Sequence, residues 1–514
     1  MHNDSSSIQD LPQFPESYWR DSVTVPSFPK LAKHTEADVV VVGGGISGIT
    51  TAYLLAREGL SVVLVEAGQL LNGTTGHTTA KITAQHDLIY DEFIQHFGQE
   101  QAKLYYQANI EAKQFIKHMV QEHKIPCDYE ERDAYIYTNS DEYLPKLQTE
   151  LAAYEKLGID GELVTQIDLP VPIKAALVMR NQAQFHPVKY LDKLVQLFVE
   201  LGGQIYEHTT VETIDKGTLP TVITQDGFKL TCKHAVSCSH FPCYDGMGFY
   251  FARMHAERSY VVGIPNKNVQ LSGMYISAEN PKRSIRTAAL DSGESLLLIG
   301  GEGHKTGQGI CTIKHYEALK AYANDVFGAA EISYRWSAQD LVTLDKMPYI
   351  GQISSSVSNV YVATGYRKWG MTNGTAAALL LRDIIMGRES AYQELYTPSR
   401  FHVDPDVKTF FAQNADVAKH LISGKLERVH NKPENLSNDE GAVVSIDGRR
   451  AGAYRDEQGM LHIVDTTCTH MGCELEWNHG ERSWDCPCHG SRFSYEGDVL
   501  EGPAAKPLKK ILPS

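Results

Sequence analysis

The feature that most constrains the fold is a run of valines followed by closely spaced glycines near the N-terminus. Residues 39–42 are four valines in a row, which suit a strand buried on both faces of a parallel sheet. Gly43, Gly45 and Gly48 follow with G-x-G-x-x-G spacing, and an apolar helical pattern then leads to a second valine-rich strand that ends at Glu66. This order of strand, glycines, helix, strand and acid predicts an α/β dinucleotide-binding unit.

Each part of this glycine segment has a physical role. The glycines permit a tight turn and let backbone N–H groups approach a pyrophosphate at the positive end of the helix. The acid, 18 residues past the third glycine, can accept hydrogen bonds from a ribose. The predicted cofactor contacts in this segment are Gly43, Gly45, Ile46, Ser47, Gly48 and Glu66. Taken alone, the segment fits either FAD or NAD.

A second glycine-rich segment favours FAD. Residues 360–387 indicate a strand ending in Ala-Thr-Gly, a glycine-containing turn and an apolar helix. This layout resembles the last element of the D-amino-acid oxidase / glycine oxidase superfamily of FAD enzymes, in which the helix N-terminus points at the flavin ring and supports negative charge there. The resemblance implies flavin contacts at Gly365, Gly370, Met371 and Thr372. The alternative is an ordinary crossover from strand to helix.

The resemblance covers about residues 35–400. Residues 185–214 are similar to the superfamily's central helix and the strand that follows it, which implies that Val211 lies near the adenine. The implied fold is a Rossmann-like α/β FAD-binding domain built from about residues 36–85, 185–245 and 335–390. An α+β cap over the substrate would comprise about residues 86–184 and 246–334, and residues 1–35 form a polar N-terminal segment.

One histidine between these parts stands out. In the dimethylglycine and sarcosine dehydrogenases of this superfamily, a Gly-Ser-Thr-x-His segment carries a histidine bonded covalently to the flavin. His77 in "GTTGHT" stands at the matching place, although Gly76 replaces the family's aromatic residue and threonines follow. The alternative is a histidine that only hydrogen-bonds to the flavin or to a phosphate.

The C-terminal part holds two short loops that each offer one thiol and one imidazole. Cys468 and His470 form the first pair, and Cys486 and His489 form the second. Zinc fingers instead pair cysteine with cysteine and histidine with histidine. A two-iron cluster held by two sulfurs on one iron and two nitrogens on the other matches the observed order, which is the ligand set of a Rieske centre.

The two loops resemble those of the cytochrome bc-type Rieske proteins. "CTHMGC" and "CPCHGS" match that family, in which Cys473 and Cys488 would form a disulfide that clasps the loops. Ser491 takes the position whose hydroxyl donates to a bridging sulfide, whereas Phe493 replaces a tyrosine found in high-potential members. We therefore predict a potential below the upper end of the Rieske range of roughly −150 to +300 mV. A small all-β domain over residues 431–514, after a linker at 422–430, is expected.

Length and composition limit the number of domains, the possible partners and the expected location of the protein. At 514 residues the chain is long enough for two or three domains. Its 48 basic and 63 acidic residues give a net charge of −15, which argues against a nucleic-acid partner. No secretory signal or membrane span is evident, so a cytoplasmic location is expected. Five of the nine cysteines lie outside the two loops and are expected to be buried thiols.

These features together predict an FAD-dependent dehydrogenase with a [2Fe-2S] cluster. The superfamily's substrates suggest that it oxidises an amine or amino-acid-like C–N bond and passes electrons through the cluster to an unidentified acceptor. Candidates for substrate contact are Arg367, Lys368 and Trp369, with Arg286 and His304 as further residues of the cap. The alternatives are a reductase running in the opposite direction and a redox sensor without turnover. A Rieske oxygenase is disfavoured because no well-spaced set of two histidines and a carboxylate is present.

Overall fold

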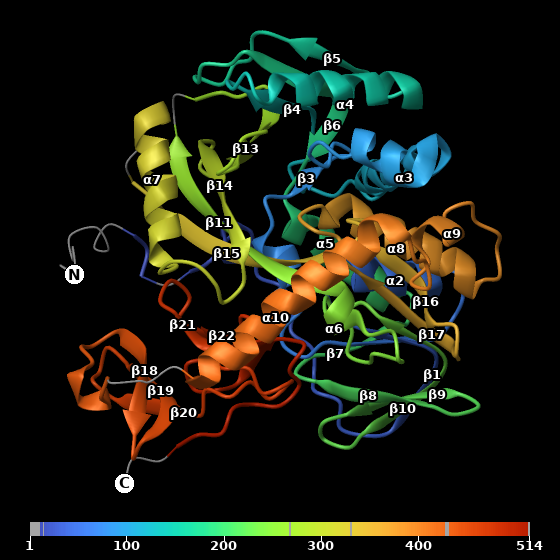
Figure 1. Cartoon of the computed structure of the whole chain (residues 1–514). Coiled ribbons are helices and arrows are strands. Elements are labelled where there is room, and N and C mark those ends of the chain that lie inside the picture. Colours follow the sequence, from blue (N-terminus) through green and yellow to red (C-terminus); the bar gives the residue numbers. More distant parts are fainter. Residues whose placement is uncertain (1–10, 14, 267–268, 329–330, 427–430, 512–514) are drawn as a thin grey trace.

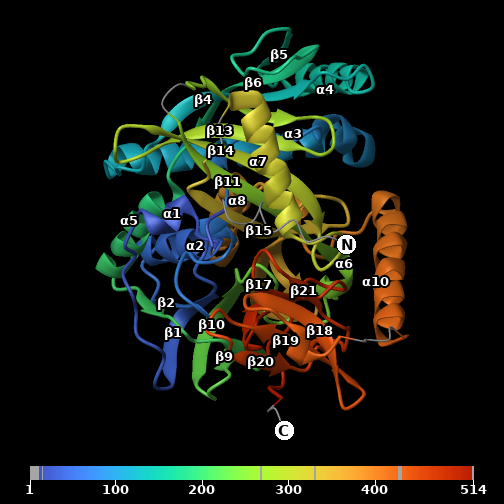
Figure 2. The ribbon, with the colours of Figure 1, turned by 90° about the vertical axis from the view of Figure 1, so that its left-hand side faces the viewer.

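The chain builds two large sheets and a small C-terminal β domain in a computed structural model that describes residues 11–13, 15–266, 269–328, 331–426 and 431–511. Figure 1 shows the second sheet and its helices above the first, with the small domain beside them and helix α10 crossing between. Figure 2 shows α10 along one flank of the small domain. No helix in the described ranges is long and apolar enough to cross a membrane.

The first sheet carries the glycine segment. Its eight strands follow the order β16-β17-β10-β1-β2-β7, with β9 joined to β10 and β8 to β9. β1 runs parallel to β2 and β10, and its four valines are buried because helices cover the sheet. The strands are β1 (Thr35–Val42), β2 (Val62–Val65), β7 (Gln204–Tyr206), β8 (Val211–Lys216), β9 (Pro220–Thr224), β10 (Lys229–Ser237), β16 (Tyr349–Ser354) and β17 (Val357–Thr364).

Three helices pack on this sheet and on one another. Helix α2 contacts both α5 and α8, which explains why nearly all its residues are buried. The three helices are α2 (Ile46–Arg57), α5 (Pro187–Glu200) and α8 (Gly370–Ile385). Short helices α1 (Tyr18–Asp21), α6 (Tyr250–Arg253) and α9 (Gln393–Tyr396) lie in the connections.

The second sheet has nine strands in the order β15-β11-β14-β13-β12-β4-β6-β3, with β5 joined to β6. The strands are β3 (Lys81–Ile82), β4 (Glu130–Thr138), β5 (Gly161–Val164), β6 (Ala175–Gln184), β11 (Met254–Asn266), β12 (Gly273–Ser277), β13 (Arg283–Ala289), β14 (Ser295–Lys305) and β15 (Tyr334–Thr343). Its helices are α3 (Tyr90–Glu122), α4 (Leu144–Leu157) and α7 (Ile313–Phe327). β15 pairs with β11, so this sheet draws on a segment that the sequence assigns to the FAD-binding part.

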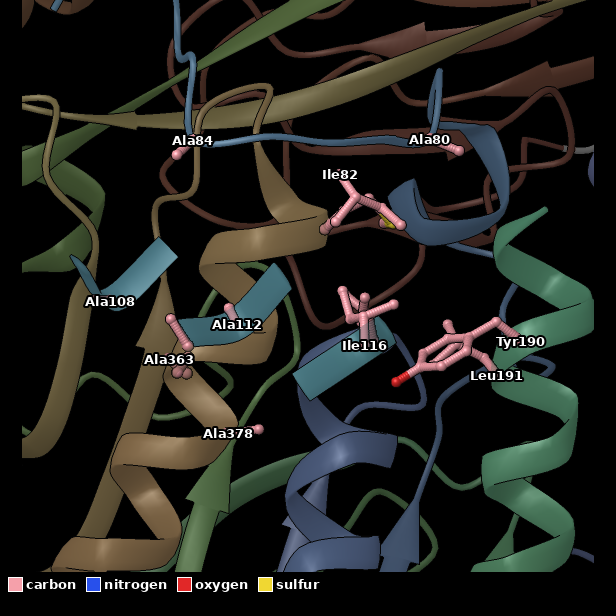
Figure 3. Close-up of a cluster of buried hydrophobic side chains, with 14 of the residues drawn as sticks. Ala80, Ile82, Ala84, Ala108, Ala112, Ile116, Tyr190, Leu191, Ala363 and Ala378 are labelled. Atoms are coloured by element: carbon pink, nitrogen blue, oxygen red, sulfur yellow. The ribbon is translucent and has the colours of Figure 1, made fainter. Parts of the chain in front are cut away.

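A common core joins the two sheets. Figure 3 shows alanines of α3, Ala108 and Ala112, close to Ala363 of β17 and Ala378 of α8. These small side chains allow close packing of the helices, and α3 contacts α8. Burial of this shared core fixes the cap against the FAD-binding part.

The C-terminal domain is all β, as predicted. A three-stranded sheet contains β18 (Glu440–Ile446), β19 (Arg449–Arg455) and β20 (Leu461–Val464), and a four-stranded sheet contains β21 (Glu476–Asn478), β22 (Ser483–Asp485), β23 (Arg492–Ser494) and β24 (Val499–Glu501). Helix α10 (Lys408–Leu426) precedes it and packs Val417 and Leu421 on its core. The expected linker, residues 422–430, begins inside α10, and residues 427–430 lie outside the described ranges; the domain boundaries stay a prediction.

Candidate functional site

One large cavity of about 1430 Å³ lies between the two sheets and the C-terminal domain. Its walls combine the glycine loop after β1, the loop at residues 66–79, strands β11, β14 and β15, and the turn before α8. Residues 498–505 and Pro507 of the C-terminal domain form another part of the wall. A single cavity therefore touches all three parts of the chain.

The glycine loop has the geometry that a dinucleotide requires. A Cβ on Gly48 would lie 1.9 Å from the carbonyl oxygen of Gly43, so the third glycine serves the contact between helix and strand. Gly43 has a φ of +110°, and a Cβ there would lie 2.5 Å from the carbonyl oxygen of Cys238. Gly43, Gly45, Ile46 and Ser47 line the cavity, whereas Gly48 is behind it.

Glu66 directly follows β2 and lies at the wall of the cavity. Its carboxylate accepts hydrogen bonds from the backbone N–H groups of Gly44, at 2.7 Å, and Gly68, at 2.8 Å. Burial raises the pKa of Glu66, and these hydrogen bonds oppose the shift. Val211 lines the same cavity at the start of β8. The arrangement fits the adenosine half of FAD, and the roles of both residues stay a prediction.

The turn before α8 brings together the residues proposed for the flavin and substrate. Gly370, Met371, Arg367, Lys368 and Trp369 all line the cavity. Gly365 and Thr372 are not on its wall: Gly365 has a φ of +79° with Thr343 beside it, and Thr372 donates to the carbonyl oxygen of Thr83 at 3.0 Å. These two positions support the turn.

The three substrate candidates of this turn are already partly engaged. A guanidinium nitrogen of Arg367 donates to the carbonyl oxygen of His86 at 2.9 Å, and the Trp369 ring stacks on the His86 imidazole at 4.9 Å. Lys368 lies 3.5 Å from the carboxylate of Glu257 on β11. Each of the two cations of this turn, Arg367 and Lys368, therefore already has a partner at the wall.

His77 also lines the cavity, in the loop beside the glycine turn. Its Nδ1 is 3.0 Å from the carbonyl oxygen of Gly73, and burial lowers its pKa. Both the covalent and the noncovalent interpretation keep this histidine at the flavin. Acid precipitation separates the two, because a noncovalent flavin is released into the supernatant.

The two other cap candidates do not line the cavity. Arg286 is 1% exposed and donates to the carbonyl oxygens of Ala80 and Phe185. His304 has both ring nitrogens engaged, with Tyr260 and with its neighbour's carbonyl.

Three further residues line the cavity although no sequence pattern indicates them: Glu257, Asp340 and His315. Burial raises the pKa of Asp340 to about 7. No motif surrounds these three residues, so no signal in the sequence pointed to them.

The four predicted cluster ligands converge at the tips of two loops. Cys468 and His470 lie between β20 and β21, and Cys486 and His489 lie between β22 and β23. The imidazole rings are 5.1 Å apart, and a hydrogen bond with Cys486 lowers the pKa of the Cys468 thiol. Within the described residues, the Nδ1 atoms of both histidines are buried without a hydrogen-bond partner. Two thiols and two free imidazole nitrogens fit a [2Fe-2S] cluster with mixed ligands.

Cys473 and Cys488 form a disulfide, which confirms the pairing that the resemblance implies. Ser491 is fully buried, and its hydroxyl is hydrogen-bonded to Cys468. The hydroxyl oxygen also accepts a hydrogen bond at 3.0 Å from the N–H of Ala504, in the segment after β24. Phe493 is also fully buried. The surroundings of the two cluster loops thus offer the Ser491 hydroxyl as a donor, but Phe493 provides no second hydroxyl where high-potential members have a tyrosine.

Restoring the missing hydroxyl is expected to raise the cluster potential. In Phe493→Tyr the phenol would donate to a ligand sulfur and favour the reduced state, with an effect of about 1 kcal/mol, or ~40 mV for one electron. Ser491→Ala should lower the potential by a similar amount. Redox titration followed by electron paramagnetic resonance measures both, and equal potentials in all three proteins would contradict the assignment.

The cluster loops are docked on the oxidoreductase part of the chain. Phe251 of α6 contacts the rings of His470 and His489, at 5.8 and 5.7 Å between ring centres. The side-chain N–H of Gln339 on β15 donates to the carbonyl oxygen of Gly490 at 2.9 Å. The next residue along β15, Asp340, lines the cavity. One hydrogen bond and the covalent bonds between Gln339 and Asp340 therefore join the cluster loop to the cavity wall.

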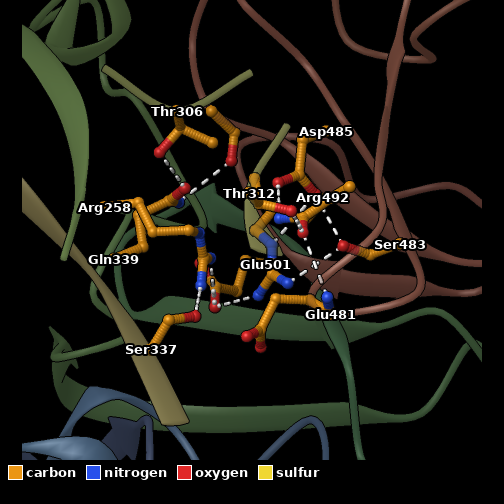
Figure 4. Close-up of polar contacts among 12 residues, drawn as sticks. Arg258, Thr306, Thr312, Ser337, Gln339, Glu481, Ser483, Asp485, Arg492 and Glu501 are labelled. Atoms are coloured by element: carbon orange, nitrogen blue, oxygen red, sulfur yellow. Dashed lines mark hydrogen bonds and ion pairs between the residues drawn. The ribbon is translucent and has the colours of Figure 1, made fainter. Parts of the chain in front are cut away.

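A buried ionic network reinforces this contact (Figure 4). Arg258 of β11 pairs with Glu501 of β24 at 3.5 Å, and Glu501 also pairs with Arg492 at 2.9 Å. Arg492 continues to Asp485 at 3.1 Å. Glu501 lines the cavity as well. Removing one partner of a buried ion pair leaves an unpaired charge, which is strongly destabilising. The network therefore favours the arrangement in which the Rieske domain is docked on β11.

Comparison with known proteins agrees with this architecture. The chain is 53% identical over 497 residues, 97% of both chains, to the Rieske 2Fe-2S iron-sulfur protein YhfW of Bacillus subtilis (strain 168). It is 23% identical to the gamma-glutamylputrescine oxidoreductase of Escherichia coli (strain K12), over 70% of this chain and 86% of that one. Glycine oxidase from Geobacillus kaustophilus has the same fold over 71% of this chain and 99% of its own, with a TM-score of 0.61 and 18% identity.

Two family models match, and together they cover most of the chain. The Rieske [2Fe-2S] domain matches residues 428–512. The FAD dependent oxidoreductase model, DAO, matches residues 38–384. FAD and a [2Fe-2S] cluster are the cofactors that these families imply, and both sites fit them. The chain belongs to the DAO family of FAD dependent oxidoreductases and carries a C-terminal Rieske domain.

Proposed function

We propose that this protein is a dehydrogenase that oxidises the C–N bond of an amine or amino-acid-like substrate and passes the electrons one at a time through the Rieske cluster to an external acceptor. FAD accepts a hydride and the cluster a single electron, so a chain with both can divide an electron pair. Support for the substrate class comes from the relatives, because gamma-glutamylputrescine and glycine are amine compounds.

The observation that carries the proposal is the shared wall of the cavity. Glu501 and the loop after it belong to the Rieske domain, yet they line the cavity that begins at the dinucleotide glycines. Gln339 bonds to Gly490, the residue next to the cluster ligand His489. This contact supports internal transfer, because the cluster loop and the cofactor cavity are neighbours in the same molecule.

The chain's own residues would bind and orient the reactants. The glycine loop and the N-terminus of α2 would hold the pyrophosphate, and Glu66 the ribose. The turn at residues 365–371 would lie against the flavin ring, where the N-terminus of α8 supports negative charge. The cap sheet would cover the substrate and exclude water, so that oxidation occurs in an enclosed site.

The test is anaerobic mixing of the purified protein with a panel of N-methyl amines and amino acids. Bleaching of the flavin followed by a reduced-cluster signal in electron paramagnetic resonance is the expected result. Reduction of the cluster only by an external reductant, followed by flavin reduction, would instead support the reverse direction. No response to any amine would leave a redox sensor as the better account.

A further inference from the structure

The cap wall carries a histidine–carboxylate pair for which the proposed function has no role. The Nδ1 atom of His315, in the first turn of α7, lies 3.2 Å from a carboxylate oxygen of Glu302 on β14. His315 is 7% exposed and lines the cavity. Its other nitrogen, Nε2, is buried and has no hydrogen-bond partner within the described part of the chain.

An irregularity between β11 and β14 places Glu302. Arg258 pairs with His304 and Tyr260 with Gly301, so two residues of β14 bulge out of the ladder. Glu302 is one of these two and has a φ of +57°. Its second carboxylate oxygen is held at 2.7 Å by Arg283 of β13. The carboxylate is therefore fixed from one side and faces His315 on the other.

This pairing determines which nitrogen of His315 is free to accept a proton. A carboxylate accepts a hydrogen bond, so the neutral imidazole carries its proton on Nδ1 and keeps the lone pair on Nε2. The Tyr260 ring stacks on His315 at 4.8 Å and fixes its plane. The result is an oriented base on a residue that lines the cavity, with a buried Nε2 lone pair that no described group uses.

The bulge also lies beside the loops that face the flavin site. A Cβ on Gly303 would be 2.7 Å from Nζ of Lys368, two residues before α8 begins. A Cβ on Gly300 would be 3.5 Å from the side chain of Thr79, two residues after His77. Residues 300–303 thus pass between the two loops, and Glu302 reaches His315 from there.

We propose that His315 is the base that deprotonates the substrate ammonium and that Glu302 is its positioning residue, an inference that rests on the proposed function. An N–H bond of the ammonium breaks and a bond from the proton to Nε2 forms, while the positive charge moves to the imidazolium beside Glu302. The N–H bonding pair stays on the substrate nitrogen, so no oxidation state changes in this step. It leaves the neutral amine that hydride transfer to FAD requires.

The charged and titratable groups around the pair come from several elements. They include Glu302 and His304 of β14, Arg283 of β13, Arg258 and Tyr260 of β11, Lys368 before α8, and Glu481 of the Rieske domain through Tyr316. Only His315 among the two stacked histidines has an open nitrogen. His304, 4.5 Å from it, bonds to Tyr260 and to the carbonyl of Lys305.

The matched variants are His315→Gln and His304→Gln, studied as the full holoprotein. With an amine that reduces the flavin, His315→Gln should slow anaerobic flavin reduction about 100-fold or more near neutral pH. Its rate should then climb with pH until the amine itself loses its proton, and added imidazole should restore part of it. His304→Gln should keep the wild-type pH profile. Glu302→Gln should fall between the two, because the base remains but loses its orientation.

A second readout does not depend on turnover. Diethyl pyrocarbonate modifies neutral imidazole nitrogens, and mass spectrometry of the treated holoprotein should find His315 modified faster than His304, with slower modification in Glu302→Gln. Equal flavin reduction and equal pH profiles in the two histidine variants would overturn the proposal, as would a His315 no more reactive than His304. Failure of every amine to reduce the flavin overturns the proposed function instead. The rate of modification by diethyl pyrocarbonate would still show whether His315 has a reactive neutral nitrogen.

Discussion

Replacing Cys486 by alanine is expected to abolish electron delivery to an external one-electron acceptor while the flavin chemistry continues. The sulfur is predicted to be one of the two thiolates that hold one iron, and loss of a ligand should lower cluster affinity by roughly 100-fold or more. Iron content and the reduced-cluster resonance should therefore disappear. Anaerobic reduction of the flavin by substrate should stay within about 2-fold, because this residue is outside the cavity wall.

The control for this variant is Cys232→Ala. Cys232 is a buried cysteine like Cys486, but it lies on β10 of the first sheet and not in a cluster loop. Its removal creates a cavity of similar size without removing a ligand, so iron and turnover should be retained. Full transfer to the acceptor by Cys486→Ala, with no cluster bound, would show that electrons leave directly from the flavin.

Replacing Gly490 by alanine should separate the cluster loop from the oxidoreductase part. Gly490 has a φ of +80°, and a Cβ there would lie 2.3 Å from the Cβ of Ala256 and 3.3 Å from the side chain of Gln339. The loop must move, at a cost of about 1–3 kcal/mol for the overlap, and the Gln339 hydrogen bond is lost. We expect cluster reduction after flavin reduction to slow by about 10-fold or more, because the two sites no longer hold their relative positions.

Gly472→Ala is the matched control. Gly472 lies in the other cluster loop with a φ of +73°, but a Cβ there would meet nothing within 4 Å. Both variants strain the backbone by about 1–2 kcal/mol, whereas only Gly490→Ala disturbs the interface. Denaturant unfolding measures the stability difference and stopped-flow absorbance the internal rate. Equal internal rates in the two variants, at equal iron content, would show that the docked contact has no role in transfer.

The sequence predicts those parts of the molecule that depend on local spacing. Gly43, Gly45 and Gly48 specify a turn whose geometry is set within a few residues, and the turn forms as the pattern indicates. The loops with Cys468 and Cys486 are also local, so their spacing predicts the ligands, and the disulfide that their resemblance implies is confirmed. In both cases the chemistry of the residues and their spacing carry the information.

The remaining features depend on contacts between distant segments. Asp340 and His315 belong to β15 and α7, and only the order of strands in the second sheet brings them to one cavity. The same holds for the contact between Gln339 and Gly490, which joins residues 151 positions apart. Arg286 and His304 show the converse: their residue types suggest a site, but neither lines the cavity, and both donate or accept hydrogen bonds with neighbouring groups.

The most direct test of the account is the dependence of cluster reduction on protein concentration. Rapid freeze-quench electron paramagnetic resonance after anaerobic mixing with a reducing amine gives the rate at which the cluster signal appears. Transfer within one docked chain predicts a first-order rate that is the same at all protein concentrations. A rate that rises in proportion to concentration, or a cluster that stays oxidised while the flavin is fully reduced, would contradict the account.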